Sequence, residues 1–416
     1  MSKQDLQFWL LDNASFKEKL NRLTLESVQN QFKNLKYKNL NSDEHDWNYL
    51  LFCASILAQS DNGSCQDAAL RIAQATLESK QTKQAQKDAA TIVLDSLANK
   101  PAIKLALKRN LIETNITDRL PIELARDWVK RSFENSITLT NFSSLSVNKF
   151  QKSFWEKAQN NDWVSISAPT SAGKSYIVSQ WLVDFIKANE KSLIIYIVPT
   201  RALIQQVQID IEFILKDENL KKVSVSTIPL KASLIEENSN ILVFTQERLH
   251  IFLNSLNSNL RCDLLVIDEA HKIGDESRGV LLQQAIETAI YLNPKCKILF
   301  ASPMTENPEI FLQDASDNIK TAPLSSENIT VNQNLLWVSQ VYGKPKIWTL
   351  SLIIENKPLA IGEIELSSSP SEISKKLPFI TYALGKSTGG NVIYVNGAAE
   401  AENTAKQLFD LIQSKD

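Results

Sequence analysis

The stretch Trp163-Val-Ser-Ile-Ser-Ala-Pro-Thr-Ser-Ala-Gly-Lys-Ser175 decides how this sequence is interpreted. Its first five residues alternate apolar and polar side chains, as a β-strand does, and residues 176–188 carry apolar side chains at helical spacing. Between them, the residues from Ala168 onward fit the pattern Gly-x4-Gly-Lys-Ser/Thr, with alanine in place of the first glycine. We therefore expect a strand, a phosphate-binding loop and a helix within an α/β fold.

In a loop of this kind, backbone N–H groups face an anion and the following helix adds its positive end. Lys174 is expected to reach the β- and γ-phosphate oxygens, and Ser175 to ligate Mg²⁺. Taken alone, the string is also compatible with a chance Gly-Lys-Ser in a turn. The residues expected to bind the nucleotide are Ala168, Pro169, Thr170, Ser171, Ala172, Gly173, Lys174 and Ser175.

A second string, Asp268-Glu-Ala-His271, directly follows the apolar run 264–267. A buried strand that ends in two acids delivers carboxylates to a metal, so Asp268 is expected to hold Mg²⁺ and Glu269 to orient and deprotonate an attacking water. The alternative, a strand end with solvated acids, is disfavoured by Lys174 upstream. Together the two strings indicate hydrolysis of ATP with Mg²⁺, at the carboxyl ends of parallel strands.

The two strings resemble those of superfamily 2 helicases of the DExH type. Pro199-Thr-Arg-Ala-Leu203 and Val243-Phe-Thr-Gln-Glu-Arg-Leu249 look like the nucleic-acid motifs of that family. The run from Asp268 to Gly279 is similar to the branch of archaeal repair helicases and exosome-associated RNA helicases. The chain also resembles helicase subunits of bacterial anti-phage defence systems of the Hachiman kind. The resemblance implies a RecA-like fold for the P-loop domain.

The resemblance also implies roles for single residues. His271 would complete a catalytic set with Lys174, Asp268 and Glu269. Gln151, 23 positions before Lys174, would read the edge of adenine, although a glutamine in a polar helix is also often only solvated. The residues implied to grip the backbone of a nucleic-acid strand, with DNA favoured over RNA, are Pro199, Thr200, Arg201, Thr245 and Arg248, and Lys221, Lys222 and Arg261 are further basic candidates.

The motif that couples hydrolysis to strand separation departs from the family. Where relatives have Ser-Ala-Thr, this chain has Ser302-Pro-Met304, so the serine is kept and the threonine is lost. A thioether cannot replace a hydroxyl donor, so we expect altered coupling. The residues assigned to coupling are Ser302 and Arg278.

The overall composition indicates what kind of protein carries these motifs. The 416 residues are 43% hydrophobic and 22% charged, which indicates a globular chain of about two or three domains. We find neither a long apolar run nor a signal pattern, so we expect a cytoplasmic protein with no membrane contact. A net charge of −2 does not by itself indicate nucleic-acid binding, although a basic cleft is compatible with it. The cysteines lack metal-binding spacing and are expected to be reduced: Cys53, Cys65, Cys262 and Cys296.

Changes in the hydrophobic pattern along the chain predict four parts. Residues 1–140 show helical spacing throughout and are expected to pack on the motor or to dock a partner protein. Residues 141–325 form the P-loop domain, and residues 326–385 a short β-rich segment of three strands with a linker at 367–371. Residues 386–416, with a buried strand at 391–395 and a helix after it, resemble the start of an incomplete second RecA-like domain.

The rest of that second lobe is not found in this sequence, which has no Gln-x-x-Gly-Arg-x-Gly-Arg run. In the family this lobe supplies arginines worth roughly 10³ to 10⁵ in rate. We expect the chain to bind ATP-Mg and a strand, while hydrolysis and unwinding need a C-terminal remainder or a second polypeptide. The alternative function is an ATP-switched module that binds another protein subunit. Kinase chemistry is disfavoured because Thr200, Arg201 and Thr245 have no role in it.

Overall fold

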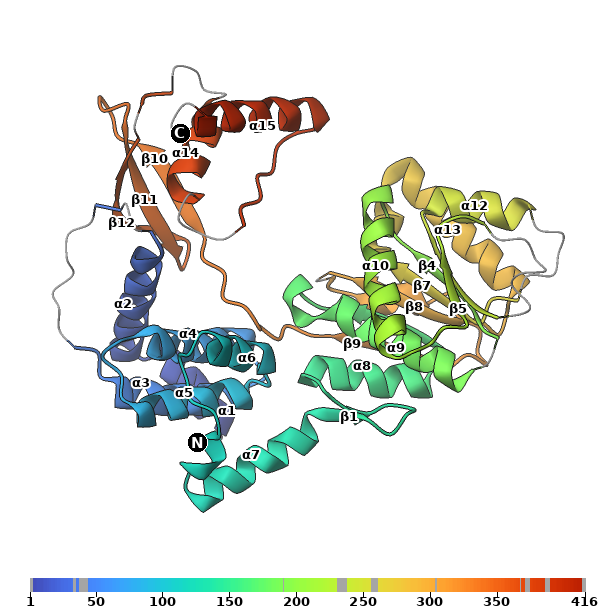
Figure 1. Cartoon of the computed structure of the whole chain (residues 1–416), viewed down its shortest axis with the longest axis horizontal. Helices are drawn as coiled ribbons and strands as arrows, with labels where there is room; N and C mark the ends of the chain where they lie inside the picture. The colour runs from blue at the N-terminus through green and yellow to red at the C-terminus, as the bar shows by residue number, and fades with distance from the viewer. Residues whose placement is uncertain are drawn as a thin grey trace. The chain divides into compact units, whose positions relative to one another are not determined.

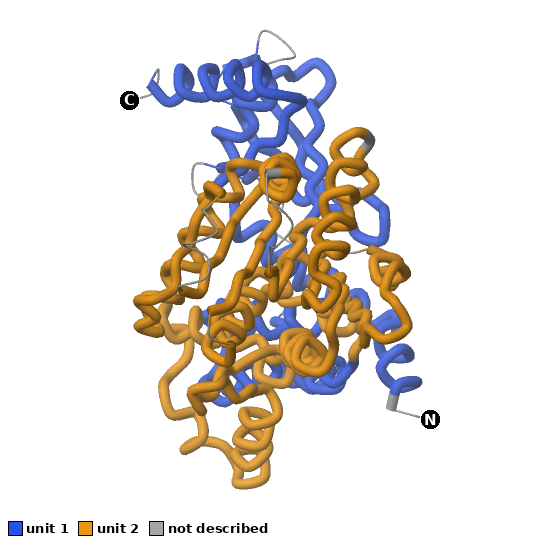
Figure 2. The backbone as a smooth tube through the Cα atoms, turned by 90° about the vertical axis from the view of Figure 1, so that its right-hand side faces the viewer, with its two compact units in different colours: residues 1–60, 67–93, 332–416 blue, residues 61–66, 94–331 orange. Residues whose placement is uncertain are grey.

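The computed structural model of the chain describes residues 3–32, 35–36, 44–189, 191–229, 238–255, 261–303, 305–366, 368–370, 375–385 and 390–413. By its internal contacts the chain divides into two compact units (Figure 2). The first unit comprises residues 1–60, 67–93 and 332–416, and the second comprises residues 61–66 and 94–331. Three positions discussed above, Met304, Ser367 and Ser371, lie outside the described residues.

A seven-stranded sheet forms the centre of the second unit. Its order is β5-β6-β4-β7-β8-β3-β9, and every neighbouring pair is parallel. The carboxyl ends of all these strands therefore meet at one edge, and the predicted α/β class with a parallel sheet is confirmed. The strands are β3 (Trp163–Ser167), β4 (Leu193–Ile197), β5 (Val223–Ser226), β6 (Ser239–Phe244), β7 (Leu264–Asp268), β8 (Lys297–Ser302) and β9 (Thr321–Ser325).

Helices cover both faces of this sheet (Figure 1). Alternate residues of β4 enter the two layers: Ile194 and Tyr196 pack with one set of helices, Ile195 and Ile197 with the other. Burial on both faces explains why these strands read as continuous apolar runs. One face is covered by α8 (Lys149–Asn160), α9 (Lys174–Ala188) and α10 (Arg201–Asp217), and the other by α12 (Gln246–Ser255) and α13 (Glu276–Leu292).

The chain before the sheet is helical, as its spacing predicts. Short side chains cap several helices: Asn13, Asp46 and Asn99 each accept a hydrogen bond from a backbone N–H of the first turn. None of the helices in the described ranges is long and apolar enough to cross a membrane. The helices are α1 (Lys3–Asp12), α2 (Ala14–Gln31), α3 (Trp47–Leu57), α4 (Gly63–Glu78), α5 (Gln84–Ser96), α6 (Lys100–Lys108) and α7 (Ile122–Glu134), and an unpredicted hairpin of β1 (Ser136–Thr138) and β2 (Ser144–Ser146) follows.

The first unit contains a small antiparallel sheet of order β10-β11-β12, which agrees with the three predicted β segments. Its apolar face, with Trp348, Leu350 and Ile361, packs with Leu25 and Val28 of α2. The strands are β10 (Leu336–Gln340), β11 (Ile347–Ile354) and β12 (Lys357–Glu365), and two helices follow, α14 (Lys376–Gly385) and α15 (Ala398–Gln413).

The prediction of a buried strand at 391–395 is wrong. These residues form no strand, and Val392 and Tyr394 are 77% and 89% exposed. A strand exists only with a hydrogen-bonding neighbour, and none of the strands in the described residues pairs with this segment. The predicted helix after it is present as α15.

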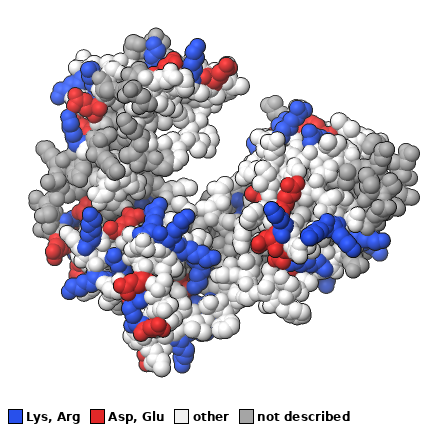
Figure 3. Space-filling model, viewed as in Figure 1, with Lys and Arg blue, Asp and Glu red and all other residues white. Residues whose placement is uncertain are grey.

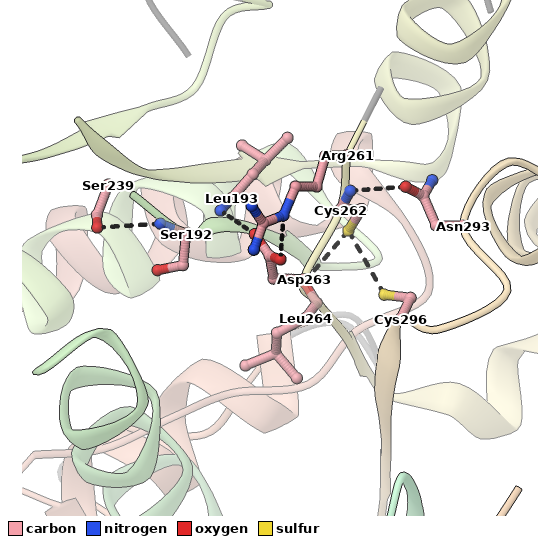
Figure 4. A network of polar contacts seen from close by, with 9 residues as sticks. All are labelled: Ser192, Leu193, Ser239, Arg261, Cys262, Asp263, Leu264, Asn293 and Cys296. Atoms are coloured by element: carbon pink, nitrogen blue, oxygen red, sulfur yellow. Dashed lines mark hydrogen bonds and ion pairs between the residues drawn. The ribbon is translucent and has the colours of Figure 1, made fainter. Parts of the chain in front are cut away.

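At the amino ends of β7 and β8 a polar network joins side chains to backbone (Figure 4). Asp263 accepts from Leu193 N at 2.9 Å and from Arg261 Nε at 2.7 Å. All four cysteines are buried, and none of them forms a disulfide in the structure. The sulfur atoms of Cys262 and Cys296 lie 3.6 Å apart. Side chains thus bond backbone groups across this edge of the sheet, although the Ser192 hydroxyl has no partner among the described residues.

Candidate functional site

The strand, loop and helix expected around the phosphate-binding string are all present. The loop after β3 contains a 3₁₀ turn at Thr170–Ala172, and α9 begins at Lys174. Gly173 has a φ of 75°, and a Cβ at this position would lie 2.6 Å from Gln151 Nε2. The turn therefore favours glycine for its left-handed backbone, and a larger residue here would also displace the Gln151 amide.

Gln151, the predicted adenine reader, lies against this loop and is 8% exposed. It is the third residue of α8, and with Asn148 it forms a reciprocal capping box. Its Oε1 accepts from Asn148 N at 3.0 Å, and its Nε2 donates to Gly173 O at 3.3 Å. The Gln151 amide thus joins the start of α8 to the phosphate-binding loop.

Lys174 is 7% exposed, and its ammonium donates to the carbonyl oxygen of Ala168. Burial lowers the pKa of Lys174, while the negative charges of Glu269 and Asp268 act to raise it. The loop lysine and the two acids therefore lie near enough to interact electrostatically, although 94 positions separate Lys174 from Asp268 in the chain. The two strings that the sequence singled out therefore lie at the same edge of the sheet, on either side of β8.

Asp268 ends β7 in a largely buried position. Burial raises its pKa to about 6, and the neighbouring charge of Glu269 adds to this rise. Two hydrogen bonds oppose it: Glu269 N donates to Oδ1 at 3.0 Å, and the Tyr196 hydroxyl donates to Oδ2 at 3.4 Å. Burial and Asp268 in turn raise the pKa of Tyr196. A carboxylate whose pKa burial raises in this way is a candidate functional group.

Glu269 adopts the left-handed backbone conformation with a φ of 55°. This conformation is uncommon for residues other than glycine and tends to occur at functional sites. The Glu269 carboxylate lies 3.3 Å from His271 Nδ1, in the 3₁₀ turn Ala270–Gly274 that follows. Glu269 and His271 are thus adjacent, as the acid motif predicts.

Of the nucleic-acid candidates, Pro199, Thr200 and Arg201 follow β4 and therefore lie at the same carboxyl edge as the loop. Thr200 and Arg201 are exposed. Thr245 follows β6 at that edge but is only 4% exposed, and Arg248 donates to a backbone oxygen at 2.6 Å.

The other basic candidates lie elsewhere. Lys221 and Lys222 precede β5, and Arg261 precedes β7, so all three lie at the opposite, amino edge of the sheet. Over the visible face, Lys and Arg are interspersed with Asp and Glu in both units (Figure 3). The candidate basic residues therefore lie at two opposite edges of the sheet.

Arg278, assigned to coupling, joins three segments of the carboxyl edge. From α13, its Nε and Nη2 donate to Glu247 Oε1 at 3.0 and 2.9 Å, at the start of α12. Its Nη2 also donates to Pro199 O at 2.9 Å, in the loop after β4. The arginine thus ties the helix after the acid motif to both predicted nucleic-acid motifs.

Ser302, the second coupling candidate, ends β8 between the strands of the two strings. It is 1% exposed, its backbone oxygen accepts from Ala168 N at 3.4 Å, and its Oγ has no hydrogen-bond partner among the described residues. A buried hydroxyl without a partner is costly and is often found at functional sites.

The donor set fits ATP with Mg²⁺. Ser175 is exposed in the first turn of α9, where backbone N–H groups have no helical acceptor and favour an anion. The Ser175 hydroxyl and the Asp268 carboxylate are the hard oxygen ligands that Mg²⁺ prefers.

Sequence reasoning missed three residues of this site. Asn148 donates to Ala172 O at 3.1 Å, Thr330 donates to Ser171 O at 2.6 Å, and Tyr196 bonds Asp268. The Asn-x-x-Gln spacing before α8 is a capping-box pattern and is a signal for Asn148. A tyrosine inside a buried strand needs a partner for its hydroxyl, which is a signal for Tyr196. Thr330 has no signal in the sequence.

Comparison with known proteins agrees with this geometry. Residues 148–309 match the family model of the DEAD/DEAH box helicases. The chain is 27% identical to the ATP-dependent DNA helicase Hel308 of Thermoplasma volcanium over 173 residues, covering 42% of this chain and 24% of that protein. It is 34% identical to Hel308 of Thermoplasma acidophilum over 148 residues, covering 35% and 21%. It is 28% identical to the Hachiman protein HamB of Bacillus cereus over 133 residues, covering 30% and 12%. The aligned region thus spans about a quarter or less of these relatives.

Proposed function

Because residues 148–309 are a DEAD/DEAH box helicase domain, we propose that the chain is the N-terminal half of an ATP-dependent nucleic-acid helicase or translocase. The observation that carries this proposal is that β3, which leads into the phosphate-binding loop, and β7, which ends at Asp268, both pair in parallel with β8 and so end at the same edge of the sheet. A phosphate-binding loop and a pair of acids at one edge are the parts that phosphoryl transfer requires.

In this proposal the backbone N–H groups at the start of α9 hold the β-phosphate, and Lys174 moves from Ala168 O to the β- and γ-phosphate oxygens. Ser175 and Asp268 hold Mg²⁺, which when bound neutralises charge on the phosphate oxygens. Glu269 accepts a proton from the attacking water, and the nearby His271 holds the Glu269 side chain. Gln151 reads adenine from the start of α8, which requires its amide to leave Asn148 N or Gly173 O.

The exposed Thr200 and Arg201 are suited to contact the phosphates of a single strand. Pro199, Thr245 and Arg248 are proposed to contact the strand as well, which requires Thr245, 4% exposed here, to become accessible. Phosphate contacts of this kind position a strand without reading its sequence. DNA rather than RNA is proposed as the strand; relatives named DNA helicases and relatives named RNA helicases both match this chain, so the ATPase assay below compares the two. Arg278 and Ser302 couple this surface to the nucleotide.

We assign strand separation and full turnover to a second lobe that supplies arginines to the γ-phosphate. This lobe belongs to a C-terminal remainder or to another polypeptide. Residues 386–416 are proposed as its start, residues 141–325 as the first lobe, and residues 1–140 and 326–385 as accessory parts.

The test is the ATPase rate of the full-length protein with single-stranded DNA, with RNA and with neither. Glu269→Gln is expected to keep ATP binding and to lower kcat by about 10² to 10⁴-fold, the usual contribution of a general base. Glu287→Gln is a matched control, since Glu287 lies exposed on α13 and bonds only Gln283 among the described residues. Equal turnover by wild type and Glu269→Gln would dismiss the assigned base, and turnover unchanged by strands would dismiss the helicase function.

A second candidate is an ATP-switched module that binds another protein through residues 1–140. None of the residues of α7 is buried, and Ile122 and Phe133 are 80% and 75% exposed. Such an apolar surface often binds a partner. Affinity capture with and without ATP tests it: capture that responds to ATP and is lost in Phe133→Asp supports this function, and capture that ignores both contradicts it.

The similarity to Hachiman HamB also motivates a role in antiviral defence. Phage plating on cells that carry wild type or Glu269→Gln tests this role. Equal plating efficiency on these cells and on cells without the gene would contradict it.

A further inference from the structure

The segment after β9 returns to the phosphate-binding loop. We name residues 326–331 the strap. The strap begins beside the loop's own strand, where Ser326 N donates to Ser167 O at 2.9 Å and extends the β3 and β9 pairing by one residue. Four residues later, the Thr330 hydroxyl donates to Ser171 O at 2.6 Å, within the loop itself.

This contact completes a row of three. The carbonyl oxygens of Ser171, Ala172 and Gly173 accept from Thr330 Oγ1, Asn148 Nδ2 and Gln151 Nε2 at 2.6, 3.1 and 3.3 Å. In a planar trans peptide the N–H points opposite to the C=O. Side chains that hold these carbonyls therefore fix the direction of the next N–H groups. Those of Gly173 and Lys174 belong to the part of the loop that receives the phosphates.

The Asn99 side chain bonds the backbone of the strap. Asn99 Nδ2 donates to Thr330 O at 2.9 Å, while Asn99 Oδ1 caps α6 by accepting from Ala102 N at 3.2 Å. Asn99 is 4% exposed. The buried Asn99 amide thus caps α6 with its oxygen and bonds the strap with its nitrogen.

The segment 61–66 holds the strap as well. Gln66 Oε1 accepts from Ile329 N at 3.1 Å, and Gln66 Nε2 donates to Asn328 Oδ1 at 3.2 Å. At Gly63 an added Cβ would lie 3.2 Å from Glu327 O, so the strap passes close to this backbone. The four successive strap residues 327–330 thus each bond or closely approach the helical segments of the same unit.

We propose that Thr330 is a positioning residue for the phosphate-binding loop, and that Asn99 holds Thr330 in place. This inference rests on the proposed ATP binding and deepens it. Nucleotide affinity depends on a hydroxyl that lies outside the loop motif, and on an asparagine in the helical part of the chain. A change at the start of α6 reaches the phosphates through two hydrogen bonds.

The test measures binding of a fluorescent methylanthraniloyl-ATP to the full chain, together with the melting temperature. Thr330→Val keeps the shape and removes the hydroxyl, so the dissociation constant is expected to rise about 2- to 12-fold, the range for one hydrogen bond. Thr330→Ser keeps the hydroxyl and is expected to bind as wild type does. Thr288→Val is the matched control, because the Thr288 hydroxyl bonds only a carbonyl of its own helix among the described residues.

Asn99→Asp separates positioning from folding. Aspartate keeps the cap of α6 but cannot donate to Thr330 O, so weaker nucleotide binding is expected with α6 intact. Wild-type affinity in Thr330→Val, or equal losses in Thr330→Val and Thr330→Ser, would overturn the positioning role. If wild type does not bind the nucleotide, the proposed function fails and the positioning role fails with it. If wild type binds but the dissociation constants of the variants equal that of wild type, only the positioning role fails.

Discussion

β7 carries an aspartate at each end, and the two have opposite surroundings. Asp263, just before the strand, accepts from Leu193 N and from Arg261 Nε at 2.9 and 2.7 Å (Figure 4). Asp268, at the carboxyl end, accepts from Glu269 N at 3.0 Å and from the Tyr196 hydroxyl at 3.4 Å. Asp263 lies beside a cation in direct contact, whereas Asp268 lies beside another acid.

The difference shows how one strand serves two purposes. Buried polar groups stabilise a fold when their partners satisfy them, as Leu193 N and Arg261 satisfy Asp263 at the amino edge. At the carboxyl edge the groups are held without full compensation: Asp268 has a raised pKa, Lys174 a lowered one, and the Ser302 hydroxyl lacks a partner among the described residues. Groups held in this state are available to a ligand.

The largest expected effect separates the two aspartates by activity. Asp268→Asn removes the charge assigned to Mg²⁺ and is expected to lower ATPase kcat by about 10² to 10³-fold, the cost of removing one group that stabilises transition-state charge. Asp263→Asn, the matched variant at the other end of the strand, is expected to keep the wild-type rate. Steady-state assays with the second lobe present check both, and similar losses in the two variants would break the comparison.

The next effect is on the pH dependence of stability without Mg²⁺. Burial raises the pKa of Asp268 from 3.8 to about 6, so between these values the folded state holds a proton that the unfolded state has lost. The stability that Asp268 contributes is therefore fully present below about pH 4 and is lost as the pH rises through about 6, by up to about 3 kcal/mol.

Asp268→Asn removes this dependence. Urea unfolding of wild type and variant at several pH values between 4 and 7 gives the difference in free energy of unfolding. Wild type is expected to lose stability relative to the variant as the pH rises. Parallel curves would show that Asp268 is not held at a raised pKa.

The smallest effect is the stability cost at the amino edge. Asp263→Asn removes a charged acceptor for Leu193 N and Arg261, so we expect it to lower the free energy of unfolding by about 1–3 kcal/mol. Arg261→Ala is the control and is expected to cost less than about 1 kcal/mol, because the Arg261 side chain is 79% exposed. Urea denaturation at neutral pH measures both, and a larger loss in Arg261→Ala would reverse this assignment.

The local parts of the site were predictable from the sequence. The strand, loop and helix around Gly173 and the acids after 264–267 follow from spacing within a few residues, and parallel strands then bring them to one edge. The contacts of Tyr196 and Thr330 were not predictable, because their partners lie 72 and 159 residues away and depend on the order of the strands.

The strand predicted at 391–395 is wrong for the same reason, since it too depends on a partner distant in the sequence. Apolar residues at 391–395 indicate a preference for burial, but a strand also needs a neighbour that local pattern does not reveal. In the same way, Lys221 and Arg261 share a charge with Arg201 but lie at the opposite edge. The proposed division into four parts and the roles of single residues remain predictions.

The strand order has a consequence for how the chain assembles during synthesis. β3 pairs only with β8 and β9 among the described strands, and these begin at Lys297 and Thr321. β3 and the phosphate-binding loop are therefore translated early. The strands that pair with β3 are translated only after more than a hundred further residues. Pairing over such separations is slow. The nascent protein must keep the unpaired backbone edges of β3 from wrong partners until β8 and β9 arrive, and such unpaired edges expose a folding chain to aggregation.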